Sequence, residues 1–170
     1  MSISMIYAVC EGYVKEVCQL YLQYIEKTVS RVADLDPAII GYLWTPELRP
    51  LTGGLKFSHK TSIARLALET NSNPVVFHRA EKEINTKSNL NHRCLEKNAE
   101  HLCLDISPLS GWKKHLNALV QLRNNIAHGS QPNRLMYSDF DSYVYNMVNL
   151  MEALEQVISM AVASRAFCAI

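Results

Sequence analysis

The chain has 170 residues and a net charge of +1, and 48% of its residues are hydrophobic while 19% are charged. This length and composition predict one globular domain spanning residues 1–170 and exclude an intrinsically disordered chain. The near-neutral charge provides no general attraction to nucleic acids or membranes, although a local cleft can still hold a phosphate.

Membrane, secretory and metal-site signals are missing from the sequence. No stretch reaches the ~18 consecutive apolar residues of a membrane span, and the N-terminal apolar run is interrupted at Glu11 with no basic region before it. The five cysteines form no C-x-x-C pair, and no two histidines are four residues apart. We therefore expect a cytoplasmic protein with no membrane association, no metal and no other cofactor.

The first half of the chain predicts one long helix followed by an irregular section. Apolar residues recur at helical spacing from about Tyr7 to Asp34, and the helix must end before the Asp36-Pro37 pair. Prolines and glycines interrupt residues 37–74, which predicts loops around one short helix near Ser58–Glu69. Residues Val75–Ile84 are compatible with a short strand or with irregular structure.

Three more helices are expected in the second half. The Ser88-Asn89 pair can cap a helix that runs to about Cys103, and Ser110 can cap one that runs through His128. A third helix, capped by Asp139, continues to about Ser164 and is about 40 Å long. Long helices with short connections predict an all-α fold: an antiparallel helical bundle of four to five helices with an irregular insertion between helices one and two.

The segment LNALVQLRNNIAHGSQ, residues 116–131, carries the candidate chemistry. Arg123 falls on the apolar stripe of its helix, where a charged side chain is costly unless it is paired or faces a cleft. Asn124 and Asn125 beside it are poor helix formers, and such local costs often accompany function. Taken alone, the Arg123/His128 spacing favours a structural arginine paired with an acid and a histidine that caps the last helical carbonyls.

Three blocks of sequence resemble one known superfamily. The heptapeptide RNNIAHG, residues 123–129, closely resembles the R-N-x-I-A-H-G signature of prokaryotic HEPN nucleases. The blocks EGYVKEVCQLYLQYI, residues 11–25, and INTKSNLNHRCLEKNAEHL, residues 84–102, resemble a small stand-alone branch of that superfamily that is common in anti-phage and toxin loci. Residues 37–76 have no counterpart in this resemblance.

The resemblance implies a homodimeric helical bundle that cleaves RNA without a metal. Arg123 and His128 would then be the catalytic pair, with Asn124 as the accompanying polar residue. These residue types suit the reaction, because RNA supplies its own 2′-hydroxyl nucleophile. Histidine can transfer protons near neutral pH, and arginine can bind the phosphate and neutralise its developing charge. The expected products carry a 2′,3′-cyclic phosphate and a 5′-hydroxyl.

Other polar residues have a functional and a structural interpretation. Glu11 could orient Arg123, with Asn125 as further support, or it could be a solvated acid. Asp139 and Asp141 resemble a metal pair, but Asp139 is better explained as a helix N-cap and Asp141 as an acid that interacts favourably with the helix dipole. Basic edges, which could guide RNA or be solvated faces, occur at His92, Arg93, Lys97, His101, Lys113, Lys114 and His115. Three tyrosines, more often core or interface residues than a base-stacking platform, are Tyr13, Tyr21 and Tyr24.

Two functions follow from the sequence. The first is a ribonuclease that acts on RNA as a toxin or an effector of anti-phage defence. The alternative is a non-catalytic HEPN module that dimerises and serves a partner protein, such as an ATPase or an antitoxin encoded in the same locus. The Arg123/His128 pair favours the enzyme, because a scaffold has no need of a polar pair on a buried stripe. Nucleotide binding without cleavage is disfavoured, since the chain has no glycine-rich phosphate loop.

Overall fold

The structure, a computed structural model, describes residues 2–44, 61, 63, 65, 67, 68, 72–77, 84, 86, 88–129 and 136–169. Five α-helices follow one another in this part of the chain: α1 (Ile3–Thr28), α2 (Pro37–Leu43), α5 (His92–His101), α6 (Lys113–Ala127) and α7 (Tyr137–Ser164). Two short 3₁₀ helices, η1 (Val32–Asp34) and η3 (Ser107–Trp112), precede α2 and α6. The described residues contain no strand, only an isolated bridge between Leu35 and Cys168. The predicted all-α fold is confirmed.

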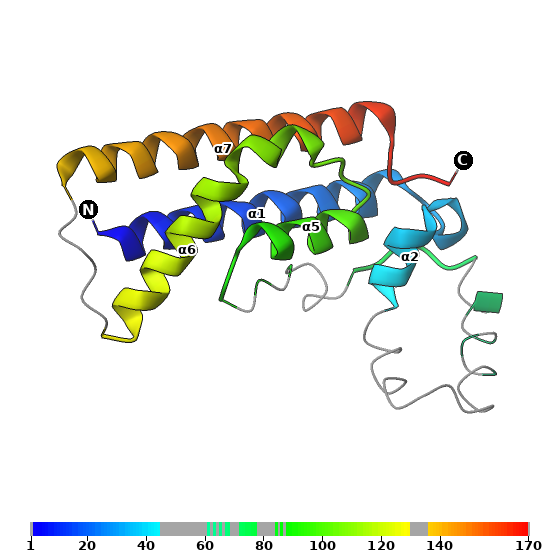
Figure 1. Ribbon diagram of the computed structural model, residues 1–170. Helices are drawn as coiled ribbons and strands as arrows, with labels where there is room; N and C mark the ends of the chain where they lie inside the picture. The colour runs from blue at the N-terminus through cyan, green and yellow to red at the C-terminus, as the bar shows by residue number, and fades with distance from the viewer. Residues whose placement is uncertain are drawn as a thin grey trace.

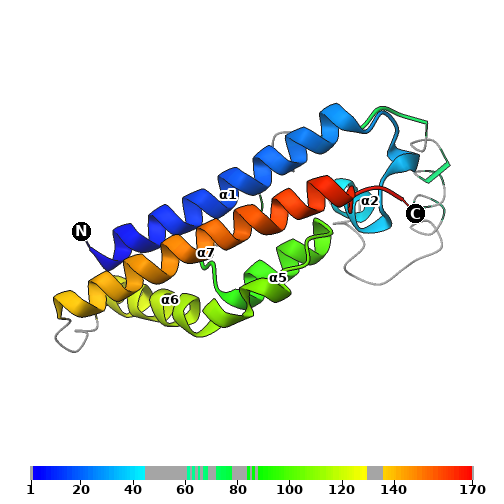
Figure 2. The same ribbon diagram turned by 90° about the horizontal axis from the view of Figure 1, so that it is seen from above.

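The two longest helices, α1 and α7, lie side by side and run in the same direction, whereas α6 runs in the opposite direction to both α5 and α7 (Figures 1 and 2). The predicted antiparallel arrangement, in which successive helices alternate in direction, therefore holds from α5 to α7. All of these helices contribute to one hydrophobic core, in which side chains such as Leu22, Ile25 and Leu119 have no exposed surface. None of the helices in the described part of the chain is long and apolar enough to cross a bilayer.

The C-terminal residues that follow α7 pack against α1 and form hydrogen bonds with the turn that follows α1. Phe167 is fully buried, and its ring meets the rings of Tyr21 and Tyr24 edge-on at centroid distances of 6.0 Å. The Asp36 amide donates to the Phe167 carbonyl at 2.8 Å. This end of the bundle is thereby closed, and the signature helix α6 approaches the opposite end of α1 (Figure 1).

The helix boundaries differ from the predicted ones for identifiable reasons. Helix α1 begins at Ile3 because the Ser2 hydroxyl accepts from the Met5 amide at 3.3 Å, and it ends at Thr28 because Val29 is extended. Helix α2 was not predicted. Its Pro37, interpreted as a helix breaker, occupies the first turn after the Asp36 cap, where a proline stabilises a helix. The described positions of 61–68 are helical, as predicted, and residues 75–77 have no regular structure; the rest of Val75–Ile84 lies largely outside the described residues.

The caps of the last three helices were predicted wrongly in detail. Asn91, rather than Ser88-Asn89, caps α5, and its side-chain oxygen accepts from the Cys94 amide at 2.9 Å. Helix α6 continues from the 3₁₀ turn η3 and has no side-chain cap. Asp139 lies inside the first turn of α7, where its carboxylate accepts from the Met136 amide at 2.8 Å.

Candidate active site

Helix α6 carries the signature segment at its C-terminal end. Its buried face consists of Leu116, Leu119 and Val120, and Arg123 continues the same stripe as a half-buried residue. The regular helix ends at Ala127, His128 is the C-cap, and Gly129 has the left-handed φ of 75° that ends the helix. The prediction that a charged side chain stands on the buried face of this helix is confirmed.

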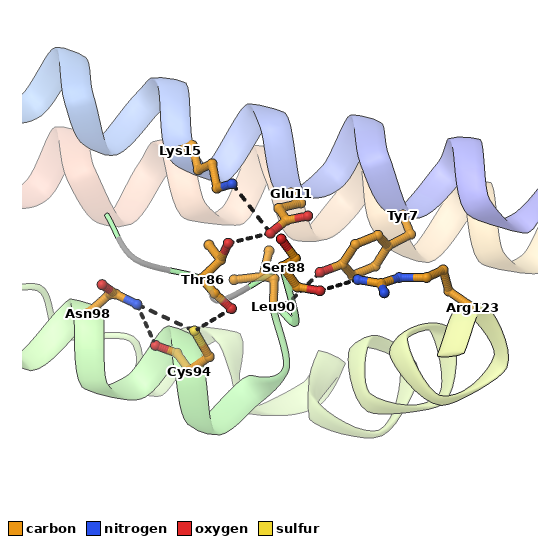
Figure 3. A network of polar contacts seen from close by, with 9 residues as sticks. All are labelled: Tyr7, Glu11, Lys15, Thr86, Ser88, Leu90, Cys94, Asn98 and Arg123. Carbon is orange, nitrogen blue, oxygen red and sulfur yellow. Dashed lines mark hydrogen bonds and ion pairs between the residues drawn. The ribbon is translucent and has the colours of Figure 1, made fainter. Parts of the chain in front are cut away.

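The side chain of Arg123 is held between α1 and the segment that precedes α5 (Figure 3). Its guanidinium carbon lies 4.1 Å from the centre of the Tyr7 ring, which is a cation–π geometry. A terminal nitrogen donates to the carbonyl oxygen of Ser88, and Nε is buried without a hydrogen-bond partner among the described residues. Ring contact and hydrogen bond together fix the orientation of the charged group.

Tyr7 takes part in two contacts at this site, one through its hydroxyl and one through its ring. Its hydroxyl oxygen accepts from the Leu90 amide at 2.7 Å, while its ring face meets Arg123. Burial raises the pKa of the Tyr7 phenol above its ordinary value, and the Leu90 hydrogen bond and the neighbouring Arg123 oppose that shift only in part. Tyr7 is therefore a neutral phenol at physiological pH, and the ring attracts the guanidinium through its electron-rich face.

Glu11 lies one helical turn after Tyr7 but does not form an ion pair with Arg123. Its carboxylate accepts a hydrogen bond from the Thr86 hydroxyl and lies 3.5 Å from the Lys15 ammonium. The interpretation of Glu11 as a direct partner of Arg123 is thus not supported, nor is Glu11 a fully solvated acid. It holds Thr86, and with it the segment that reaches Ser88, against α1 (Figure 3).

Asn124 and Asn125 form part of the lining of a groove beside α6. The groove has a volume of about 560 Å³, and its described lining comes from the segment before α5, the first half of α5 and one side of α6 from Lys113 to Asn125. Asn124 is half-buried and Asn125 is exposed. The asparagines of the signature therefore border a hollow large enough for part of a nucleotide chain.

His128 lies apart from the guanidinium of Arg123. It is exposed at the end of α6, and its backbone amide donates to the Asn124 carbonyl at 3.0 Å. No hydrogen bond joins the Arg123 and His128 side chains within the described part of the chain. In regular helix geometry, a separation of five residues places the two side chains about 140° apart around the α6 axis.

Three residues were not predicted to belong to this site: Tyr7, Thr86 and Ser88, the last of which was considered only as a helix cap. Tyr7 was identified only as a member of the apolar stripe of the first helix. The available signal was Arg123 itself, because a half-buried guanidinium requires an aromatic face or an oxygen acceptor nearby. The position of Arg123 does not indicate which residue provides the aromatic ring or the oxygen acceptor. Ser88 contributes a backbone carbonyl, which no sequence pattern reveals.

Other predicted candidates have mainly structural contacts. Asp139 caps α7, as described above, and the described residues include no group of three side chains suited to a metal ion. His92 is buried rather than part of a basic edge, and its Nδ1 lies 3.2 Å from a Glu96 oxygen without the angle of a hydrogen bond. Tyr21 belongs to the core, whereas Tyr24 is partly exposed.

Comparison with protein families identifies the class to which this chain belongs. The model of one HEPN family, described as MAE_28990-like HEPN, matches residues 1–167. The chain therefore belongs to the HEPN superfamily, and its α6 carries the RNNIAHG segment. Neither the curated proteins nor the solved structures include a significant match.

Proposed function

We propose that this protein is a metal-independent endoribonuclease of the HEPN type. The observation that carries the proposal is the half-buried guanidinium of Arg123, oriented by Tyr7 and Ser88 on the helix that ends in an exposed His128. Membership of the HEPN superfamily supports the same reading. A cation fixed in a partly dry position interacts more strongly with a phosphate than a freely moving surface arginine does.

The proposed chemistry assigns one task to each signature residue. His128 removes the proton of the RNA 2′-hydroxyl or protonates the leaving 5′-oxygen. Arg123 neutralises the charge that develops on the phosphate as the 2′-oxygen attacks. Asn124, which borders the groove, donates a hydrogen bond to the RNA. Cleavage then leaves a 2′,3′-cyclic phosphate and a 5′-hydroxyl.

A homodimer with a shared active site would unite the two catalytic groups. Five residues of regular helix advance about 500°, which leaves Arg123 and His128 about 140° apart around the α6 axis. A two-fold axis near the end of α6 would place Arg123 of one protomer beside His128 of the other. Exposed apolar side chains on α1 and α7, such as Val9 and Val148, are available to an interface.

Mixed dimers test the shared site directly. An Arg123→Ala protomer combined with a His128→Ala protomer contains one centre with both groups and one with neither. Activity should return to as much as about half of the wild-type value per heterodimer, although both mutant homodimers are inactive. Verified heterodimers without activity would exclude a shared site.

We further propose that the enzyme acts as a toxin or as an effector of anti-phage defence, together with a partner protein encoded in the same locus. The second candidate function is a non-catalytic HEPN module that dimerises for such a partner. One observation favours this alternative: the hydrogen bond from Arg123 to the Ser88 carbonyl gives the arginine a structural role.

Cleavage assays separate the two candidates. Purified protein is incubated with single-stranded RNA and with DNA of the same sequence in excess EDTA, and His128→Ala protein serves as the control. The ribonuclease should cut RNA only, and the variant should be inactive while keeping the same melting temperature. Equal cleavage by both proteins, or none by either, would favour the non-catalytic module.

A further inference from the structure

The groove beside Asn124 is lined mainly by carboxamide side chains. They come from the segment before α5 and from one side of α6, and they are Asn89, Asn91, Asn117, Gln121, Asn124 and Asn125. Such a concentration of amides in one hollow is unusual for a surface that only faces water, where lysine and glutamate predominate. Carboxamides supply both donors and acceptors, as the edges of nucleic acid bases require.

Two of these amides have a fixed orientation. The Asn91 oxygen accepts from the Cys94 amide at 2.9 Å, and the Asn117 oxygen accepts from the His92 amide at 3.0 Å. Their NH₂ groups have no hydrogen-bond partner among the described residues. Because both oxygens are occupied by backbone donors, the two side chains present N–H donors to whatever enters the groove.

The charges around the groove favour an anion. Arg93 and Lys113 line it, and neither forms an ion pair with another described residue. Among the described lining residues the acidic one is Glu96, and its carboxylate lies 3.2 Å from Nδ1 of His92. The groove therefore combines two cations that have no ion-pair partner in the described part of the chain with oriented N–H donors, which suits a ligand rich in oxygen acceptors.

The groove also leads to the candidate catalytic histidine. Asn117, Gln121, Asn124 and His128 are separated by four, three and four residues, so they form one stripe along α6. From Asn117 to His128 this stripe spans about 16 Å. A strand bound along it would pass from the amide-lined groove to His128.

We infer that this groove binds single-stranded RNA next to the cleavage site, with Asn91 and Asn117 donating to phosphate or base carbonyl oxygens. The inference rests on the proposed ribonuclease function and specifies how its substrate is held. Single-stranded RNA fits better than a duplex, because only unpaired bases expose all of their carbonyl edges to such donors.

Asparagine-to-aspartate substitutions test the inference without removing the structural contacts. Asn91→Asp keeps the oxygen that caps α5, and Asn117→Asp keeps the acceptor for the His92 amide. Each replaces the outward N–H donor by a negative charge. The matched control is Asn73→Asp, an exposed position outside the groove whose carbonyl accepts from the Val32 amide.

Binding is measured by fluorescence anisotropy with labelled oligouridylate and oligoadenylate, in a His128→Ala background that prevents cleavage. We expect Asn91→Asp and Asn117→Asp each to weaken binding about tenfold or more, and Asn73→Asp to change it less than about twofold. A loss confined to oligouridylate assigns the donors to base carbonyls, and an equal loss on both probes assigns them to phosphates. Lys113→Gln, at an exposed position of the same groove, provides a further variant and should weaken both probes.

The inference is overturned if the folded groove variants bind RNA as the control does, or if the background protein binds neither probe. Cleavage is scored separately with His128 intact. If the protein cleaves RNA and the groove variants bind RNA normally, the proposal of RNA binding in the groove is refuted and the proposed ribonuclease function stands. If the protein does not cleave RNA but the groove variants bind RNA more weakly, the proposed ribonuclease function is refuted and RNA binding in the groove stands.

Discussion

Replacing Tyr7 by phenylalanine should destabilise the protein through one buried hydrogen bond. The Tyr7 hydroxyl accepts from the Leu90 amide at 2.7 Å, and Leu90 has no exposed surface, so the variant leaves a buried N–H without an acceptor. A buried donor without a partner costs about 1–3 kcal/mol. For a chain of this size that corresponds to a decrease of about 2–12 °C in Tm. The aromatic ring, and with it the contact to Arg123, is retained.

Urea unfolding followed by circular dichroism at fixed protein concentration measures this loss. Tyr13→Phe on the same helix is the control, because the Tyr13 hydroxyl forms no hydrogen bond with another described residue, and its free energy of unfolding should change by less than about 0.5 kcal/mol. Tyr7→Leu also removes the ring and should cost about 0.5–2 kcal/mol more. The account of this contact is refuted if Tyr7→Phe and Tyr13→Phe have the same stability.

Three further predictions concern alkaline stability, assembly and toxicity. Burial raises the pKa of Cys10 and of Cys18 to about 12 from an ordinary value of 9.0, so the unfolded chain loses these protons first as the pH rises. The stabilising contribution of each thiol should therefore be complete below pH 9, and it should decrease by about 1.4 kcal/mol per pH unit towards pH 12. In urea titrations at several pH values, the free energy of unfolding of Cys10→Ala protein should decrease less steeply with pH than that of the wild type, and an equal decrease would contradict the assignment. Light scattering at micromolar concentration should give the mass of a dimer, and a monomer would exclude the shared site. Expression should inhibit growth of the host cells, and His128→Ala should relieve the inhibition; equal toxicity of both proteins would argue against catalysis as its cause.

The helices were predictable where apolar periodicity is long, and their ends were predictable only where a local cap decides them. Helix α7 follows its apolar stripe to Ser164 as expected, because 28 residues average out local signals. Helix α2 was missed because seven residues carry too little periodicity, and Pro37 has opposite meanings inside a helix and at its first turn. The start of α5 was shifted because several polar residues compete for the cap, and the tertiary structure selects Asn91.

The candidate site was predictable in its signature and unpredictable in its surroundings. An arginine on the apolar stripe of α6 indicated an unusual contact, and Arg123 is indeed half-buried. The partner is Tyr7, 116 residues earlier in the chain, and no local pattern encodes such a pairing. The same holds for Glu11, because its contact with Thr86 depends on how the segment before α5 crosses α1.

The chemical nature of the RNA ends tests the central claim most directly. A defined single-stranded RNA is cleaved in excess EDTA, and the fragments are weighed by mass spectrometry. The proposed mechanism predicts 2′,3′-cyclic phosphate and 5′-hydroxyl ends from the wild-type protein, and intact RNA with Arg123→Ala or His128→Ala protein. Fragments with 3′-hydroxyl and 5′-phosphate ends, or cleavage that persists in both variants, would contradict it.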